Sequence, residues 1–192
     1  GDVLSPRHIT SVRRANPGLE IINGYGPTEN TTFSATFKID RDYTGRIPVG
    51  IPIANSTAYI LDRGYNPVPV GITGEIYVGG DGVARGYLNR AALTDTVFLA
   101  TDKHRQNTDY FYKTGDLGRW LPDGCIDFMG RADGQVKIRG FRIELDEIAY
   151  LLMEHDGIGE AVVTVVTDES GDKRICAYVT GEDQPDRKNM RE

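Results

Sequence analysis

The sequence predicts an α+β protein built in three consecutive parts. Residues 1–44 combine one helix with two apolar strands, and residues 45–130 hold a series of short strands broken by turns. Residues 131–192 give a hairpin, a helix and two further strands. Strands and helices that are grouped in this way, rather than alternating regularly, are typical of the α+β class.

The first part begins with a helix. Ser5 followed by Pro6 is the usual pattern of a helix N-terminus, an N-cap and then proline at the first helical position. Pro17 ends this helix near Asn16, because proline cannot continue a helix. Two strands rich in apolar and β-branched residues are expected at 19–22 and 31–39.

The middle part indicates a small β-barrel or a strongly curved sheet. A short helix near residues 91–98 interrupts the strands, and "LPDG" at 121–124 is a tight hairpin turn between the last two of them. The expected strands are 57–62, 74–80, 110–116, 118–121 and 125–130.

The last part follows a polar, glycine-containing joint at 131–135 and indicates a small α+β lobe from about Gly134 onward. Leu145, Ile148, Leu151 and Leu152 recur at helical spacing. The expected elements are a hairpin at 135–144, a helix at 144–155 and strands at 161–166 and 174–181.

Composition and charge exclude several classes of function. With 39% hydrophobic and 26% charged residues, the chain has the balance of a soluble globular protein. Its formal net charge of −6 argues against a nucleic-acid surface, which needs a basic face. No apolar run approaches the ~20 residues of a membrane span, so we expect no membrane contact. Cys125 and Cys176 lack metal-binding spacing, and a reduced, cytoplasmic protein is the simplest expectation.

The stretch "NGYGPTEN", residues 23–30, is the first candidate site. Its glycines and proline alone would indicate only a turn between strands. A turn does not account for the other side chains. The ring of Tyr25 offers a stacking face for a base, and the hydroxyl of Thr28 beside glycine-freed N–H groups can hold a phosphate. The carboxylate of Glu29 can ligate Mg²⁺. Together they predict one end of a nucleotide site.

Two later stretches extend this hypothesis. In "YKTGD", residues 112–116, the carboxylate of Asp116 can accept hydrogen bonds from both ribose hydroxyls, although Thr-Gly-Asp by itself is also a good hairpin turn. In "GRADGQVKIRGFRIE", residues 130–144, Arg131 follows a strand and can reach a ribose or phosphate oxygen. The alternative interpretation of this third stretch is a solvated linker and a basic hairpin face.

With "GEIYVGGDGVARGYLNR" at 74–90 between the first two, these stretches stand in an order that resembles the adenylation domains of nonribosomal peptide synthetases. Those domains belong to the superfamily of acyl-CoA synthetases and luciferases. The resemblance covers essentially all 192 residues, and "ELDEIA" favours the peptide-synthetase branch. It implies that residues 1–44 end a large N-terminal α/β sheet subdomain, that 45–130 form a distorted β-barrel, and that 131–192 are a hinge and a truncated small C-terminal lobe.

The resemblance also implies roles for single residues. Tyr25 would stack on adenine, Thr28 would hold the α-phosphate, and Glu29 would coordinate Mg²⁺. Asp116 would hold the ribose hydroxyls, and Arg131 would reach the ribose region. The positions that match nucleotide-binding residues of the family are Asn23, Gly24, Tyr25, Gly26, Thr28, Asp116, Phe128 and Arg131.

The acyl side of the site is implied in the same way. Gly24 and Gly26 would let the backbone approach the acyl-adenylate, Asn23 would help to shape the acyl-binding side, and Phe128 would sit against the nucleotide. The positions that match the acyl pocket are Gly24, Thr32 and Phe33. They do not identify the acid that is activated.

The implied reaction has two steps. An amino acid reacts with ATP and Mg²⁺ to give aminoacyl-AMP, and the aminoacyl group then passes to the phosphopantetheine thiol of a peptidyl carrier protein. Asp133 matches the hinge of the family, about which the small lobe rotates. Gly140 matches the hairpin that lines the tunnel for the phosphopantetheine arm, where a missing side chain lets the thiol pass.

The resemblance implies that other parts of the catalytic unit lie outside this chain. They are a phosphate loop, an aspartate of the acyl pocket and a lysine near the C-terminus, so we expect the chain alone to be inactive. Its partners would be the missing N-terminal part of the adenylation domain and neighbouring synthetase domains. Two alternatives stay open: an acyl- or aryl-acid ligase with coenzyme A or a carrier protein as acceptor, and a non-catalytic fragment that docks a carrier protein.

Overall fold

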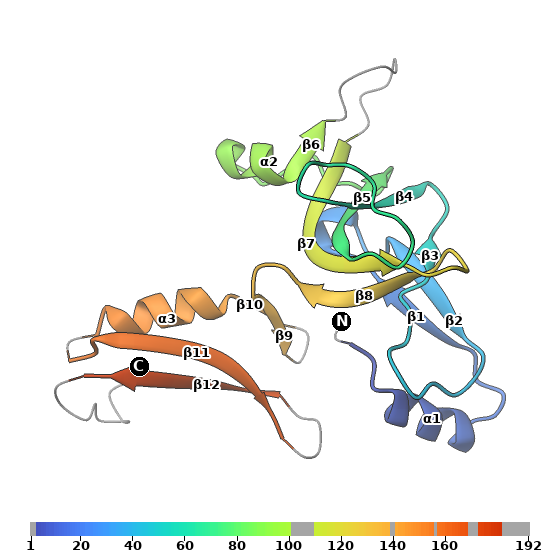
Figure 1. Ribbon diagram of the computed structural model, residues 1–192, viewed down its shortest axis with the longest axis horizontal. Coiled ribbons are helices and arrows are strands. Elements are labelled where there is room, and N and C mark those ends of the chain that lie inside the picture. Colours follow the sequence, from blue (N-terminus) through green and yellow to red (C-terminus); the bar gives the residue numbers. More distant parts are fainter. Residues whose placement is uncertain (1–2, 101–109, 139–140, 156, 169–172, 182–192) are drawn as a thin grey trace. The chain divides into compact units, whose positions relative to one another are not determined.

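The computed structural model describes residues 3–100, 110–138, 141–155, 157–168 and 173–181 (Figure 1). Contacts divide the chain into two compact units, with the boundary between Ala132 and Asp133. Both units combine strands with few helices, which confirms the α+β class. The expected separation of residues 1–44 from 45–130 stays a prediction.

The first unit begins with a helix and a small antiparallel sheet. Two basic residues, Arg13 and Arg14, lie in the last turn of the helix, where they interact favourably with its dipole. In the 23–30 stretch the strand ends at Tyr25, and a single 3₁₀ turn follows at Thr28–Asn30. The strand predicted to start at residue 31 begins four residues later, at Ala35. The elements are α1 (Pro6–Ala15), β1 (Ile21–Tyr25), η1 (Thr28–Asn30), β2 (Ala35–Ile39) and β3 (Ile51–Pro52), with sheet order β1-β2-β3.

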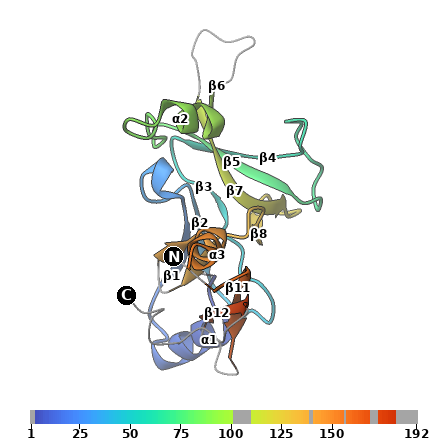
Figure 2. The same cartoon turned by 90° about the vertical axis from the view of Figure 1, so that its left-hand side faces the viewer.

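A five-stranded antiparallel sheet makes up the rest of this unit. The "LPDG" turn connects its last two strands as expected, with the N–H of Leu121 donating to the carbonyl of Cys125 at 2.8 Å. In Figures 1 and 2 the short helix α2 lies beside β6 at one end of the sheet. The elements are β4 (Ser56–Leu61), β5 (Gly74–Gly80), α2 (Ala91–Val97), β6 (Phe98–Ala100), β7 (Tyr110–Trp120) and β8 (Ile126–Arg131).

This sheet is strongly curved but open, and no closed barrel is found in the described part of the chain. Its order is β4-β5-β7-β6, and β8 also pairs with β7. The strands expected at 110–116 and 118–121 are one strand, β7, which bends at Gly115 (φ 73°) and shifts register between Leu117 and Gly118. β6 pairs with residues 110–112 and β8 with residues 116–120 along the same edge of β7. The expected barrel is therefore a curved sheet.

The core of the first unit supports the candidate site. The rings of Tyr25 and Phe128 pack against this core from β1 and β8. Two of the rings expected at a nucleotide thus rest on a rigid apolar base. The buried members of the core are Val49, Ile60, Ile76, Val78, Phe98, Tyr112 and Ile126.

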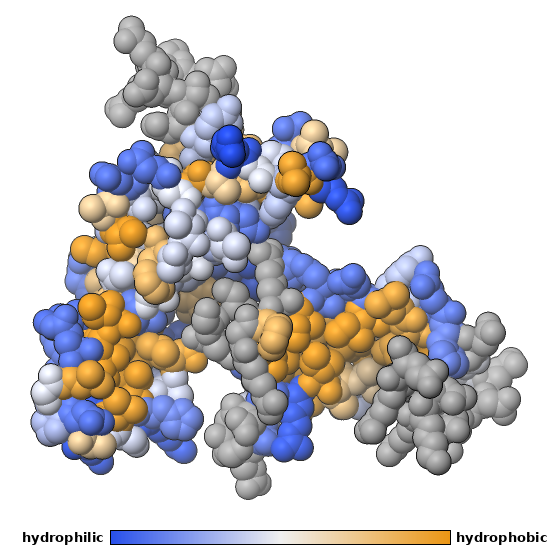
Figure 3. All heavy atoms as spheres, turned by 180° about the vertical axis from the view of Figure 1, so that it is seen from behind, coloured by the Kyte–Doolittle hydropathy of each residue, from blue (hydrophilic) through white to orange (hydrophobic). Residues whose placement is uncertain are grey.

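The second unit has the hairpin, helix and strand pair expected from the sequence. The two long strands pair antiparallel from Glu160 opposite Thr180 to Thr167 opposite Lys173, and α3 packs on β11. Apolar side chains reach the surface of both units (Figure 3). The described helices are all too short or too polar to span a bilayer. The elements are β9 (Val136–Ile138), β10 (Phe141–Ile143), α3 (Leu145–Met153), β11 (Glu160–Thr167) and β12 (Lys173–Thr180).

Candidate functional site

Three residues far apart in the sequence meet in the first unit. The hydroxyl of Tyr25 on β1 donates to Oδ2 of Asp116 on β7 at 2.6 Å. Nη1 of Arg131, at the end of β8, donates to Oδ1 of the same carboxylate at 2.9 Å. The ring of Phe128 lies 6.3 Å from that of Tyr25, centroid to centroid. The structure therefore brings together the residues expected at adenine and ribose.

A bulge in β7 orients the Asp116 carboxylate. Gly115 has a positive φ of 73°, which favours glycine, and its N–H donates to Oε1 of Glu75 at 3.1 Å. The hydroxyl of Thr114 donates to the carbonyl of Ile76 at 2.7 Å and accepts the N–H of Asp116 at 3.0 Å. Asp116 is thus held from its backbone as well as from its carboxylate.

Burial makes the charges of this cluster depend on one another. The side chains of Asp116 and Arg131 are only 9% and 12% exposed, so loss of either partner would leave a poorly solvated charge. Burial, and then the neighbouring Asp116 carboxylate, raise the pKa of Tyr25 well above its ordinary value. The phenol therefore stays protonated at neutral pH and serves as a donor to Asp116.

The residues expected at the acyl group are divided between the two faces of β1, because Asn23 and Gly24 point in opposite directions. Alternation along the strand puts Asn23 on the same face as Tyr25, where its Nδ2 donates to the carbonyl of Pro48 at 2.8 Å. Gly24 points the opposite way, and a Cβ there would lie 2.5 Å from the ring of Phe33. The ring of Phe33 thus covers Gly24 and is half exposed. Thr32 is also exposed.

Gly26 lets the 28–34 segment fold back onto β1. A Cβ at Gly26 would lie 2.6 Å from the carbonyl oxygen of Thr32 and 2.9 Å from the backbone nitrogen of Ser34. The N–H of Ser34 donates to the carbonyl of Tyr25 at 2.7 Å and closes the loop. In this structure the glycine accommodates the loop's own backbone, and its approach to an acyl-adenylate stays a prediction.

Glu29 and Thr28 lie on η1, directly after this turn. Thr28 is exposed, whereas Glu29 is buried and its Oε1 accepts a hydrogen bond from the hydroxyl of Tyr87 at 2.5 Å. The carbonyl of Glu29 accepts the N–H of Ala84 at 2.8 Å. The carboxylate expected at Mg²⁺ is therefore held by the segment that follows β5.

The residues expected to act at the hinge and at the tunnel belong to the second unit. Asp133 is its first described residue, and its Oδ1 accepts the N–H of Gln135 at 3.2 Å. Gly134 follows with a φ of 69°. Gly140 lies outside the described residues.

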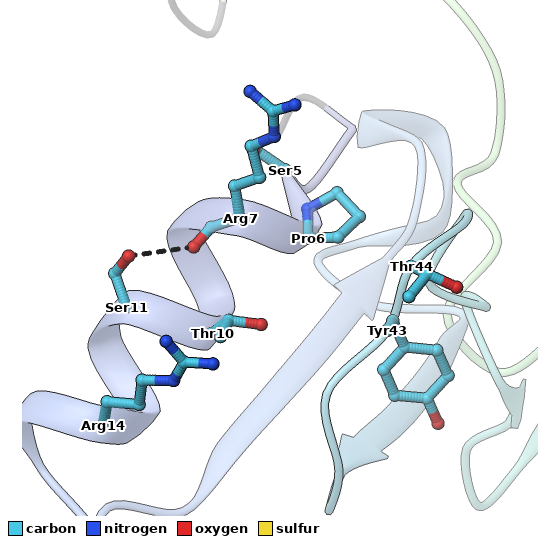
Figure 4. A pocket seen from close by; sticks show the side chains of 8 residues that line it. All are labelled: Ser5, Pro6, Arg7, Thr10, Ser11, Arg14, Tyr43 and Thr44. Atoms are coloured by element: carbon cyan, nitrogen blue, oxygen red, sulfur yellow. Dashed lines mark hydrogen bonds between the residues drawn. The ribbon is translucent and has the colours of Figure 1, made fainter.

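A surface hollow elsewhere in the first unit is separate from this site. Figure 4 shows it between α1, which contributes Arg7 and Arg14, and the segment that carries Tyr43 and Thr44. Its lining includes no residue that the sequence predicts at the nucleotide.

Three side chains of the site were not predicted from the sequence. They are Glu75 and Thr114, which hold the bulge at Asp116, and Tyr87, which binds Glu29. All three lie in stretches that the sequence singles out, 74–90 and 112–116. Their partners are up to 58 residues away, and no local pattern indicates those pairings.

Comparisons with known proteins agree with this fold. The family model for the AMP-binding enzymes matches residues 1–88. Over all 192 residues the chain is 52% identical to gramicidin S synthase 2 of Brevibacillus brevis, and over 182 residues, 95% of the chain, it is 52% identical to surfactin synthase subunit 2 of Bacillus subtilis. It spans only 4% and 5% of these relatives.

Solved structures of nonribosomal peptide synthetases are similar to this chain as well. Holo-PA1221, an NRPS protein containing adenylation and PCP domains, matches with a TM-score of 0.89 at 33% identity, over 98% of this chain and 33% of that one. The four-domain nonribosomal peptide synthetase AB3403 matches with a TM-score of 0.63 at 40% identity, over 99% of this chain and 14% of that one. The fold and the family model place this chain with the AMP-binding enzymes. Over its whole length the chain matches the adenylation domains of nonribosomal peptide synthetases, and it corresponds to their C-terminal region.

Proposed function

We propose that this chain supplies the adenine, ribose and metal side of an enzyme that activates an amino acid with ATP and transfers it to the phosphopantetheine thiol of a peptidyl carrier protein. The observation that carries the proposal is the contact of Tyr25, Asp116 and Arg131. An aromatic ring, a carboxylate and a guanidinium held together in this way are suited to a base and its ribose.

In the proposed reaction, a carboxylate oxygen of the amino acid attacks the α-phosphorus of ATP. The bond from that phosphorus to the oxygen bridging to the β-phosphate breaks, and pyrophosphate leaves. The carrier thiol then loses its proton and attacks the acyl carbon, and AMP leaves. Tyr25 and Phe128 bind the base, and Asp116 and Arg131 hold the ribose. The hydroxyl of Thr28 donates a hydrogen bond to the α-phosphate. Such placement contributes several kcal/mol to catalysis.

The residues at η1 fit a magnesium ion by their chemistry. Glu29 offers carboxylate oxygens, which Mg²⁺ prefers, and Mg²⁺ commonly takes one or two carboxylates together with phosphate oxygens and waters. No cluster of three or more His, Cys, Asp or Glu side chains occurs among the residues described. When bound, the ion would neutralise charge on the phosphates.

The similarity to peptide synthetases favours a carrier protein over coenzyme A as the acceptor. The intact protein, meaning this chain in whatever longer polypeptide carries it, should catalyse ATP–pyrophosphate exchange with at least one amino acid. Exchange only with aryl or fatty acids would favour the acyl-ligase alternative. An absence of exchange with amino, aryl and fatty acids alike would contradict adenylation.

A further inference from the structure

We propose that Tyr87 is a positioning residue for the Glu29 carboxylate and that, through this carboxylate, it sets the affinity of the site for a divalent cation bound with ATP. The inference rests on the proposed function, in which Glu29 is the metal ligand.

The contact between the two side chains is short and charge-assisted. The Tyr87 hydroxyl donates to Oε1 of Glu29 at 2.5 Å, and Glu29 is 8% exposed. Hydrogen bonds from a hydroxyl to a carboxylate at this distance are among the stronger ones in proteins. One carboxylate oxygen is therefore fixed in place.

Tyr87 is itself held firmly by α2 and β6. Its N–H donates to the hydroxyl of Thr94 at 2.9 Å, and its ring packs edge-on against Phe98 with a centroid separation of 5.4 Å. Gly86 has a φ of 133°, and a Cβ there would lie 2.4 Å from Cγ2 of Thr94. A fixed donor can orient a carboxylate, whereas a mobile one cannot.

The same segment also holds the backbone around Glu29. The N–H of Ala84 donates to the carbonyl of Glu29 at 2.8 Å, and the hydroxyl of Thr31 donates to the carbonyl of Gly82 at 2.8 Å. Residues 82–87 therefore contact η1 through main chain and side chain together. Groups that orient a metal ligand in this way commonly change metal affinity about 10- to 100-fold when they are removed.

The test compares ATP affinity with and without Mg²⁺, measured by calorimetry on the intact protein. Tyr87→Phe removes one oxygen and keeps the ring on Phe98. Mg²⁺ should raise the affinity for ATP, and we expect this increase to be about tenfold smaller in Tyr87→Phe than in the wild type. The affinity for ATP without Mg²⁺ should be unchanged. In a Glu29→Gln background the same substitution should have no further effect. Thr94→Val, which removes the acceptor of the Tyr87 N–H, should act in the same direction and provides a second variant if Tyr87→Phe is unstable.

Tyr59→Phe is the matched control, because the ring of Tyr59 also packs edge-on against a phenylalanine, Phe111, at 5.0 Å. It should change neither affinity. Equal losses with and without Mg²⁺ in Tyr87→Phe, or an additive loss in the Glu29→Gln background, would overturn the positioning role. A wild-type protein that binds ATP without any gain from Mg²⁺ would overturn the metal assignment of Glu29, and one that does not bind ATP would overturn the proposed function itself.

Discussion

The hydroxyl of Tyr25 and Oδ2 of Asp116 lie 2.6 Å apart, although 91 residues separate them in the sequence. One residue is expected under adenine and the other at the ribose. Because the hydrogen bond joins them directly, the two halves of the nucleoside would be recognised by one connected unit rather than by two independent side chains.

Tyr25→Phe tests this connection, since it keeps the ring but removes the donor to Asp116. We expect affinity for ATP to fall about three- to tenfold, the usual value of a single hydrogen bond. Affinity for 2′,3′-dideoxy-ATP should hardly change, because that nucleotide makes no use of Asp116. Equilibrium binding of both nucleotides to the intact protein measures the difference. Equal losses for the two would mean that the hydroxyl acts on the base or on the fold and not through Asp116.

Alkaline pH should destabilise the chain in part through Tyr25. Its pKa is raised in the folded state, while an unfolded tyrosine ionises near pH 10. Above about pH 10 the unfolded chain therefore binds fewer protons than the folded chain, and the free energy of unfolding falls as pH rises. In Tyr25→Phe this fall should be shallower, by up to about 1.4 kcal/mol per pH unit. Urea unfolding of the 192-residue chain between pH 8 and 11.5 measures both slopes, and identical slopes would contradict the burial of this phenol.

Gly26→Ala should open the loop that carries η1. The new Cβ would meet backbone atoms of Thr32, Phe33 and Ser34 at 2.6 to 2.9 Å, and backbone cannot move away cheaply. We expect a loss of about 1–3 kcal/mol in the free energy of unfolding, the usual cost of overpacking. Gly18→Ala is the control, because nothing lies within 4 Å of its Cβ, and its effect should be small. Similar unfolding midpoints for the two variants would refute the close packing of this loop.

Asp133→Pro should separate the two proposed half-reactions. Asp133 is the first described residue of the second unit, and proline fixes φ at about −65°, which restricts rotation there. Pyrophosphate exchange should be largely retained, while transfer to the carrier protein should fall at least tenfold, which corresponds to about 1.4 kcal/mol. Parallel loss of both reactions would indicate that the substitution harms folding rather than a hinge.

Local signals in the sequence were sufficient for most of the elements. Ser5-Pro6 marks the start of α1, and the "LPDG" turn connects β7 to β8. The continuity of β7 could not be predicted, because Thr114-Gly115-Asp116 has the composition of a turn. The strand continues through this bulge because β7 pairs with β5 on both sides of it and with β8 from Asp116 onward. Tertiary contacts overrode the local preference.

The candidate site shows the same limit. Its charged and aromatic residues could be chosen by their chemistry and by the resemblance to adenylation domains. The pairs that hold them could not, since Tyr25 and Asp116 meet only after β1 and β7 fold onto one core. Tyr87 carries no chemical signal of its own, and its part in the site becomes visible only with Glu29 beside it.

The most direct test of the nucleotide site is the affinity of the intact protein for ATP in Asp116→Asn, compared with Asp127→Asn. Both aspartates are buried on the same sheet and pair with an arginine at 2.9 Å, Asp116 with Arg131 and Asp127 with Arg119. The two variants should therefore cost similar folding stability. We expect Asp116→Asn to weaken ATP binding by roughly 2–3 kcal/mol, about 30- to 150-fold, and Asp127→Asn to leave the dissociation constant unchanged. Equal dissociation constants for Asp116→Asn and wild type would contradict the assignment of this cluster to the nucleotide.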